Sequence, residues 1–160
     1  MRLLITNDDG FDAPGILTLA RACAKAGHDV LVSAPATQQS AAGHRLTLTQ
    51  SLMVREHHLD AAFPVFSVEG TPVDCVRIGR RLSDKPIDFC LSGINDGENV
   101  GTALFYSGTA AAAREAAMLN IPSMAISIAY GADETMRAHL AEQALMIMGY
   151  ILKRPMPRLT

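Results

Sequence analysis

The sequence lacks several features that mark whole classes of protein. Its three cysteines, Cys23, Cys75 and Cys90, stand alone in apolar stretches, without the paired spacing of zinc sites or secreted disulfide scaffolds. We interpret them as small buried residues in a reducing cytoplasm, and we expect the chain to fold without disulfides. No apolar run is long enough to span a bilayer, and no signal region precedes the first expected strand.

An excess of charge of one sign is also lacking. The formal net charge is -2 at pH 7, and acids and bases are scattered along the chain. This pattern gives no electrostatic basis for binding a nucleic-acid polymer or an anionic membrane. It does not exclude a small anionic substrate, because one bound metal ion can hold such a molecule locally. No Gly-x-Gly-x-x-Gly motif follows the first expected strand, which argues against a nicotinamide-binding domain.

What is present is an alternation of strand-like and helix-like segments over a length that suits one domain, residues 1–160. Such alternation predicts an α/β fold with a mostly parallel sheet and right-handed crossovers. We expect strands over residues 3–6, 29–34, 87–92 and 123–128, and helices that start near residues 14, 72, 110 and 134. We expect a loop or short helix at residues 35–45. Residues 46–49 and 52–55 predict an edge strand or hairpin arm, with residues 65–68 as its partner.

The first expected strand runs directly into two adjacent acids, Asp8 and Asp9, followed by a glycine. A short apolar run that ends in turn residues is typical of an interior parallel strand, and open α/β sheets bind ligands at the carboxyl ends of their strands. Two neighbouring carboxylates repel each other, and a shared cation relieves that repulsion. Oxygen ligands favour magnesium, manganese or calcium over zinc. The alternative is that these residues form an ordinary polar turn.

Polar residues at three further places are expected at the same edge of the sheet. Ser40 follows the second strand, and a glycine- and asparagine-rich segment with Asn95 and Asn99 follows the strand at 87–92. The segment 107–109 opens an alanine-rich helix, so that its hydroxyls and unpaired amide groups form an anion site. A cation site beside an anion site suits phosphoester hydrolysis.

Five ordered motifs in the chain resemble those of the SurE (survival protein E) family of metal-dependent nucleoside monophosphate phosphatases. They are Asn7-Asp8-Asp9-Gly10 with Ala13-Pro14-Gly15, Ala34-Pro35 with Ser40, Gly70-Thr71-Pro72 with Asp74-Cys75, Ser92-Gly93-Ile94-Asn95 with Gly97 and Asn99, and Tyr106-Ser107-Gly108-Thr109 with Ala111, Ala112 and Glu115. The resemblance covers essentially the whole chain.

The resemblance implies a three-layer, Rossmann-like α/β/α sandwich with 5′- and 3′-nucleotidase activity on free nucleotides, sometimes with exopolyphosphatase activity. It also implies one divalent metal, Mg²⁺ or Mn²⁺, at the positions of Asp8, Asp9, Ser40 and Asn95. We expect Asp8, Asp9 and Asn95 to act in catalysis, and Ser40, Asn99 and Ser107-Gly108-Thr109 to bind the substrate phosphate. A cytoplasmic homo-oligomer, a dimer or tetramer, is the expected assembly.

The chain departs from the family pattern in three ways. The family commonly has an acid after Ala-Pro and bases before the serine, where this chain has Ala36 and Gln38-Gln39, and Ala41 stands where a glycine is common. Family members are also considerably longer. Their carboxy-terminal extension, used for subunit exchange and for part of the wall around the site, is expected to be absent here, in a fragment or in a shortened relative.

Several roles stay open at this point. His44 lies near the expected site and can donate to phosphate or be simply solvated, while Glu115 is expected to make a structural hydrogen bond inside its helix. For the reaction we favour in-line attack by a metal-activated water over a covalent intermediate on Asp8, because phosphatases with an acid nucleophile usually separate their two acids by one residue. The alternative function is a metal- and nucleotide-binding module without turnover.

Overall fold

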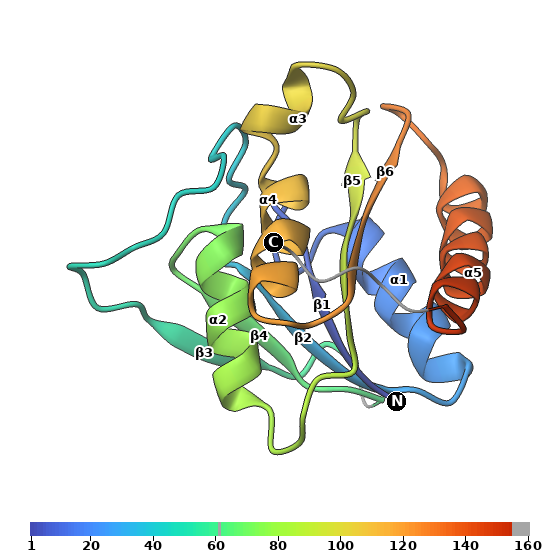
Figure 1. The fold of residues 1–160 in the computed structure, drawn as a ribbon, viewed down its shortest axis with the longest axis horizontal. Helices are drawn as coiled ribbons and strands as arrows, with labels where there is room; N and C mark the ends of the chain where they lie inside the picture. The colour runs from blue at the N-terminus through green and yellow to red at the C-terminus, as the bar shows by residue number, and fades with distance from the viewer. Residues whose placement is uncertain (61, 155–160) are drawn as a thin grey trace.

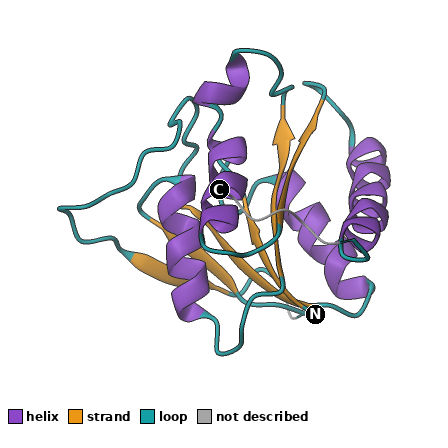
Figure 2. Cartoon of the chain, in the orientation of Figure 1, coloured by secondary structure: helices purple, strands orange, loops and turns teal. Residues whose placement is uncertain are grey.

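The computed structural model describes residues 1–60 and 62–154. Its strands are β1 (Arg2–Thr6), β2 (Asp29–Pro35), β3 (Val54–His57), β4 (Val65–Val68), β5 (Phe89–Asp96) and β6 (Ser123–Ile128). Its helices are α1 (Pro14–Lys25), α2 (Pro72–Leu82), α3 (Ala103–Tyr106), α4 (Gly108–Met118) and α5 (Glu134–Ile151). Figures 1 and 2 show how strands and helices alternate along the chain.

The strands form one sheet in the order β3-β4-β2-β1-β5-β6. All neighbours pair in parallel except β3 and β4, which are antiparallel. The mostly parallel sheet predicted from the sequence is therefore confirmed, and β1 lies inside it. Because parallel strands point the same way, the carboxyl ends of β1, β2, β4 and β5 meet at one edge.

Helices cover both faces of the sheet, which makes three layers (Figure 1). Alternate residues of a strand point to opposite faces. Leu3 and Ile5 of β1 accordingly pack in the core cluster formed with α1 and α5, and Leu4 packs in the cluster formed with α2 and α4. The predicted three-layer α/β/α sandwich is confirmed.

Local signals place the two helix starts that matter most for the site. Thr71 caps α2 and accepts from the backbone N–H of Asp74, whose carboxylate accepts from the Thr71 N–H, so the pair forms a capping box. Ser107 caps α4 and accepts from the N–H of Ala110. In both cases a side chain stabilises the helix terminus that faces the carboxyl edge of the sheet.

The structure corrects three of the sequence expectations. Residues 46–49 form no strand, and the partner of β4 is β3, at Val54–His57. β5 does not end at Ser92 but runs to Asp96, because its pairing with β6 resumes after an irregularity. The short helix α3 was not expected. Residues 36–45 form a loop, which is one of the two structures expected for this segment.

Candidate active site

The acidic turn after β1 is shaped by the side chain of Asn7. This buried amide donates to the carbonyl oxygen of Gly10 at 2.8 Å and accepts from the Gly10 N–H at 3.2 Å. Gly10 has a φ of 121°, a conformation that L side chains rarely adopt. The turn therefore holds Asp8 and Asp9 at the end of the strand without using their own carboxylates.

Asp8 lies against the first turn of α4. The residue is 7% exposed, and one of its carboxylate oxygens accepts from the hydroxyl of Thr109. A Cβ atom added to Gly108 would lie 2.8 Å from Cβ of Asp8 and 2.9 Å from Oδ2, so only glycine fits there. The positive end of the α4 dipole stabilises a carboxylate in this position.

Asp9 is only partly buried and has different neighbours. Burial, and next the negative charge of Asp8, raise the pKa of its carboxyl group above the ordinary value of 3.8. The N–H of Asp96 donates to Oδ2 at 3.3 Å. A cation bound here would stabilise the ionised forms of both neighbouring acids.

Ser40 is exposed and lies in the loop that follows β2. Figure 1 shows this loop, residues 36–53, between β2 and β3. The N–H of the preceding residue, Gln39, donates to the backbone carbonyl of Asp8 at 2.7 Å. Ala41, the following residue, has a φ of 56°, so the chain turns sharply directly after the serine. The structure thus brings Ser40 beside the acidic turn.

Asn95 lies near the end of β5, next to Asp96, whose N–H donates to Asp9. Its amide nitrogen donates to the carbonyl oxygen of Gly97 at 2.7 Å. Asn99 is held differently, since its amide nitrogen donates to the hydroxyl of Ser127 on β6 at 2.9 Å. Asn95 is therefore beside the two acids, whereas Asn99 is tied to the neighbouring strand.

The N-terminus of α4 lies at the segment for which the sequence predicts an anion site. The first backbone N–H groups of a helix have no partner within the helix, and here they belong to Gly108 and Thr109. Ser107 is 6% exposed and uses its oxygen as the helix cap. The Thr109 hydroxyl donates to Asp8, so only the backbone N–H of this residue is available to bind an anion.

A cavity of about 660 Å³ opens at the carboxyl ends of β2 and β4, beside the Ser40 loop. Its wall includes Thr37, Gln39, Arg45 and Thr71. Because β2 lies next to β1 in the sheet, this cavity neighbours the acidic turn. Its volume lies in the range of small-molecule sites.

The residues that the structure describes contain no group of three or more His, Cys, Asp and Glu side chains placed to hold a metal ion. The candidate site has two carboxylates, and the other protein ligands of a metal ion there would be hydroxyl and amide oxygens. Such hard, neutral oxygen ligands suit Mg²⁺ or Mn²⁺ and not a soft metal. The donor set therefore fits the metal implied by the sequence motifs.

One feature of the site escaped the sequence analysis. Thr109, expected to bind phosphate, uses its hydroxyl on Asp8, 101 residues away in the chain. Only tertiary structure joins residues so distant, although the spacing of Ser107 and Thr109 at a helix start marked the segment.

Comparison with known proteins gives consistent results. The sequence model of the family described as "Survival protein SurE" matches residues 3–158. The chain is 48% identical over 158 residues to "5'-nucleotidase SurE" of Syntrophus aciditrophicus, covering 96% of this chain and 59% of the relative. It is 44% identical over 157 residues to the protein of the same name from Solidesulfovibrio magneticus, covering 97% of this chain and 59% of the relative.

A solved structure agrees with these sequence matches. The crystal structure of the SurE protein from Aquifex aeolicus superposes with a TM-score of 0.85 and 39% sequence identity, covering 99% of this chain and 62% of that one. The chain thus spans about three-fifths of the length of its relatives. None of the described helices is long and apolar enough to cross a membrane. By family model, sequence identity and fold, the chain belongs to the SurE family.

Proposed function

We propose that this chain carries the active site of a metal-dependent nucleotidase that hydrolyses nucleoside 5′- and 3′-monophosphates. The observation that carries the proposal is the contact between Asp8 and the first turn of α4, through Thr109 and Gly108. This contact puts an acidic turn suited to a metal next to a helix terminus suited to phosphate. The relatives support the 5′ part of this activity, since both are named 5'-nucleotidases.

In the proposed site, Asp8, Asp9, Ser40 and Asn95 hold one divalent metal, Mg²⁺ or Mn²⁺. When bound, such a metal neutralises phosphate oxygens and lowers the pKa of a bound water. The backbone N–H groups of Gly108 and Thr109, with the hydroxyl of Ser107, receive phosphate oxygens. The second amide hydrogen of Asn99, which its bond to Ser127 does not use, is available for the same task.

The proposed reaction is an in-line displacement at phosphorus. Asp9, the more accessible of the two acids, orients a water molecule and accepts its proton as the water oxygen bonds to phosphorus. The ester P–O bond breaks, the nucleoside oxygen takes up a proton from solvent, and Asp9 releases to solvent the proton that it accepted. The amide groups at the start of α4 stabilise the charge that develops on the phosphoryl oxygens. Asp8 is a poor nucleophile in this geometry, because it is buried and one oxygen is bonded to Thr109.

The nucleoside part is proposed to lie in the cavity beside the Ser40 loop. A nucleotide whose phosphate sits at the acidic turn must extend its sugar and base to one side. The cavity begins one strand away from β1, within a nucleoside's reach, and its polar wall includes Gln39 and Thr71. The cytoplasmic location and the homo-oligomeric state expected from the sequence stay predictions.

The test is phosphate release from a panel of 5′- and 3′-nucleoside monophosphates with Mn²⁺, with Mg²⁺ or with EDTA. Asp9→Asn should reduce metal-dependent release by at least about a hundredfold, since it removes a ligand and a proton acceptor. Asp12→Asn is the matched control, because Asp12 is an exposed acid in the same turn. Equal turnover by both variants would contradict the proposal.

A second candidate function is a module that binds metal and nucleotide without turnover. Electron paramagnetic resonance of free Mn²⁺ separates the two functions. Binding of Mn²⁺ that Asp9→Asn abolishes, with phosphate release at background in the wild type, would favour the binding module.

A further inference from the structure

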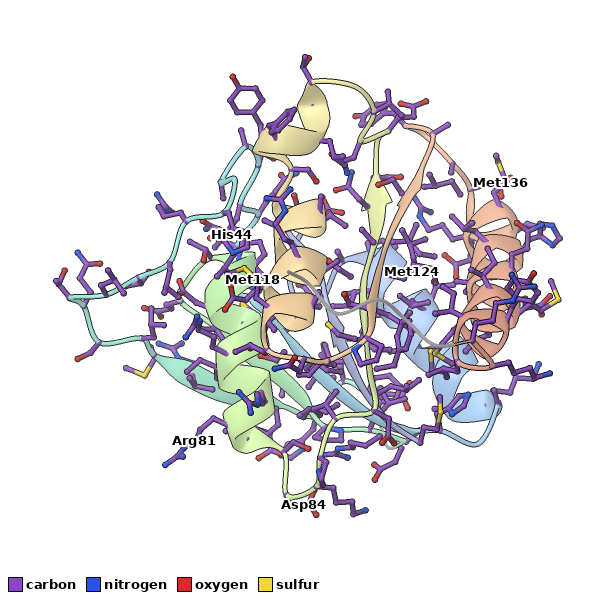
Figure 3. All side chains as sticks on the ribbon, in the orientation of Figure 1. His44, Arg81, Asp84, Met118, Met124 and Met136 are labelled. Atoms are coloured by element: carbon purple, nitrogen blue, oxygen red, sulfur yellow. The ribbon has the colours of Figure 1, made fainter. Side chains whose placement is uncertain are left out.

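A buried carboxylate lies two turns inside α4, away from the acidic turn. Glu115 is 2% exposed, and its two oxygens meet cations or donors from two other segments. Nε2 of His44, in the loop after β2, lies 2.8 Å from Oε2, and Nε of Arg77, on α2, lies 2.7 Å from Oε1. Figure 3 shows His44 beside α2 and α4. One side chain thus joins the loop to both helices on this face.

These contacts are not a strong source of net stability. Removing a carboxylate from water is costly, and the attraction of its partners repays that cost only in part. Arg77 is also largely exposed, so water screens its charge. The more specific consequence of these contacts is that they fix the position of the loop, because His44 lies four residues after Ser40.

Nε2 of His44 lies 2.8 Å from a carboxylate oxygen of Glu115. An ionised carboxylate only accepts, so opposite ionised Glu115 the ring donates from Nε2. The other nitrogen, Nδ1, is buried and has no hydrogen-bond partner among the described residues. The contact with Glu115 is therefore what fixes this ring in place.

The loop segment that carries Ser40 is fixed on both sides of the serine. On one side the N–H of Gln39 donates to the carbonyl oxygen of Asp8, and on the other His44 meets Glu115. Between them the N–H of Gly43 donates to the carbonyl oxygen of Tyr106 at 3.0 Å. Ser40 is exposed, so its position depends on these flanking contacts and not on packing.

We infer that Glu115 is a positioning residue for the site, acting through His44 to hold Ser40 at a set distance from the first turn of α4. Helix α4 then carries both the amide groups proposed to bind phosphate and Glu115, which holds the loop whose serine is proposed to bind metal. This inference rests on the proposed function for its catalytic meaning. The anchoring of the loop itself can be tested without turnover.

The experiment compares the wild-type chain with three variants. His44→Ala removes the donor to Glu115, His44→Gln keeps an amide donor of similar reach, and Arg77→Met removes the other partner of the same carboxylate without touching the loop. Amide hydrogen exchange by NMR reports the N–H groups of Gln39 and Gly43. Mn²⁺ titration followed by paramagnetic resonance reports the metal site, and thermal unfolding gives the stability of each variant.

For His44→Ala we expect faster exchange at Gln39 and Gly43 and about tenfold weaker Mn²⁺ binding, the usual effect of losing a residue that orients a metal ligand. His44→Gln should restore most of both. Arg77→Met should leave both near wild type even where it lowers the unfolding temperature. Unchanged exchange in His44→Ala, or equal changes in His44→Ala and Arg77→Met, would overturn the inference.

Turnover is recorded in parallel, as kcat and KM for a nucleoside monophosphate. His44→Ala should lower kcat/KM about tenfold, and His44→Gln should recover it. If the wild type releases no phosphate, the proposed nucleotidase function fails, while the exchange and Mn²⁺ measurements still decide on the anchor. The two failures are therefore distinguishable.

Discussion

Asp8 and Asp9 are neighbours in the sequence, yet the structure gives them different surroundings. Asp8 is buried against α4 and receives the Thr109 hydroxyl, whereas Asp9 is partly exposed beside Asp96. A fixed acid and a more accessible acid side by side can divide the tasks of holding a metal and orienting water. This division cannot be read from an Asp-Asp pair in a sequence.

The crowding around Asp8 makes Gly108 a sensitive position. In Gly108→Ala the new methyl group meets Asp8 at less than 3 Å, so α4 or the acidic turn must move. We expect a loss of about 1–3 kcal/mol in the free energy of unfolding and at least about tenfold weaker Mn²⁺ binding. Denaturant unfolding and Mn²⁺ titration measure the two effects.

Gly149→Ala is the matched control for this substitution. Gly149 lies in α5, and an added Cβ meets nothing within 4 Å. Alanine favours a helix interior over glycine, so this variant should gain about 0.5–1 kcal/mol and bind Mn²⁺ as the wild type does. Wild-type Mn²⁺ affinity in Gly108→Ala would show that the acidic turn tolerates the displacement and would contradict the prediction.

The raised pKa of Asp9 predicts that replacing this residue stabilises the metal-free fold, although the same change is expected to reduce activity. Burial and the charge of Asp8 disfavour the ionised carboxyl group, so at neutral pH this group destabilises the metal-free fold. Asp9→Asn should therefore raise the unfolding temperature in EDTA by about 2 °C. In excess Mn²⁺ the wild type should gain stability and the variant should not.

Thermal unfolding of the wild type, Asp9→Asn and the exposed control Asp12→Asn, each with EDTA and with Mn²⁺, measures this difference. Asp12→Asn should follow the wild type under both conditions. A fall in the unfolding temperature of Asp9→Asn in EDTA would mean that the hydrogen bond from the Asp96 N–H to Asp9 outweighs the cost of burial and the repulsion from Asp8, and the prediction would be wrong.

Among the elements, α2 is tied to the loop before β3 by one buried acid. Asp74 accepts from the N–H and hydroxyl of Thr47 at 2.9 and 2.8 Å, and from the N–H of Thr71 at 2.9 Å. Burial by itself would raise the pKa of Asp74, but these hydrogen bonds hold it below the ordinary value of 3.8. The same carboxylate thus takes part in the cap of α2 and holds the loop at Thr47.

A carboxyl group with a lowered pKa stabilises the fold above its ordinary pKa, and this contribution is lost as pH falls through the folded-state pKa. Asp74→Asn should therefore cost about 2 kcal/mol of the free energy of unfolding at pH 7, because an amide cannot accept the same set of donors. The difference from the wild type should shrink below about pH 4.

Urea unfolding at several pH values tests this prediction, with Asp84→Asn as the control. The Asp84 side chain is 72% exposed, so its substitution should have little effect at any pH. A cost for Asp74→Asn that is the same at pH 7 and at pH 3 would show that packing, and not the charge of Asp74, sets its contribution.

For the whole molecule, the three cysteines report on global unfolding. Cys23, Cys75 and Cys90 are buried and free, and burial raises the pKa of the Cys23 and Cys90 thiols to about 12. Since the thiolate is the reactive form, these thiols should react with a disulfide reagent only when the fold opens. We expect rates at least about a thousandfold slower than in denaturant.

Ser51→Cys supplies the positive control, because residue 51 is exposed and its thiol should react at once. In the wild type, all three thiols should react together once denaturant unfolds the chain. Rapid reaction of one native cysteine would mean that its part of the sheet opens independently of the rest, and the molecule would not behave as one cooperative unit.

The sequence by itself determined the architecture of the fold and named the segments in which the candidate site residues lie. Alternating apolar segments separated by turn residues indicate a parallel α/β sheet, because local periodicity and burial are coupled in strands and helices. The sequence also predicts helix starts near residues 72 and 134, where Thr71 and Asp133 cap α2 and α5, since a cap depends on neighbours only three residues away.

Only the tertiary structure decided which side chains meet. The length of β5 depends on its pairing with β6, and the edge strand is β3 at Val54–His57 because that segment finds its partner in β4. The bond from Thr109 to Asp8 and the contact of His44 with Glu115 join residues 101 and 71 positions apart. No local pattern encodes such contacts, because they exist only when the packed helices and the sheet fix the distance between distant segments.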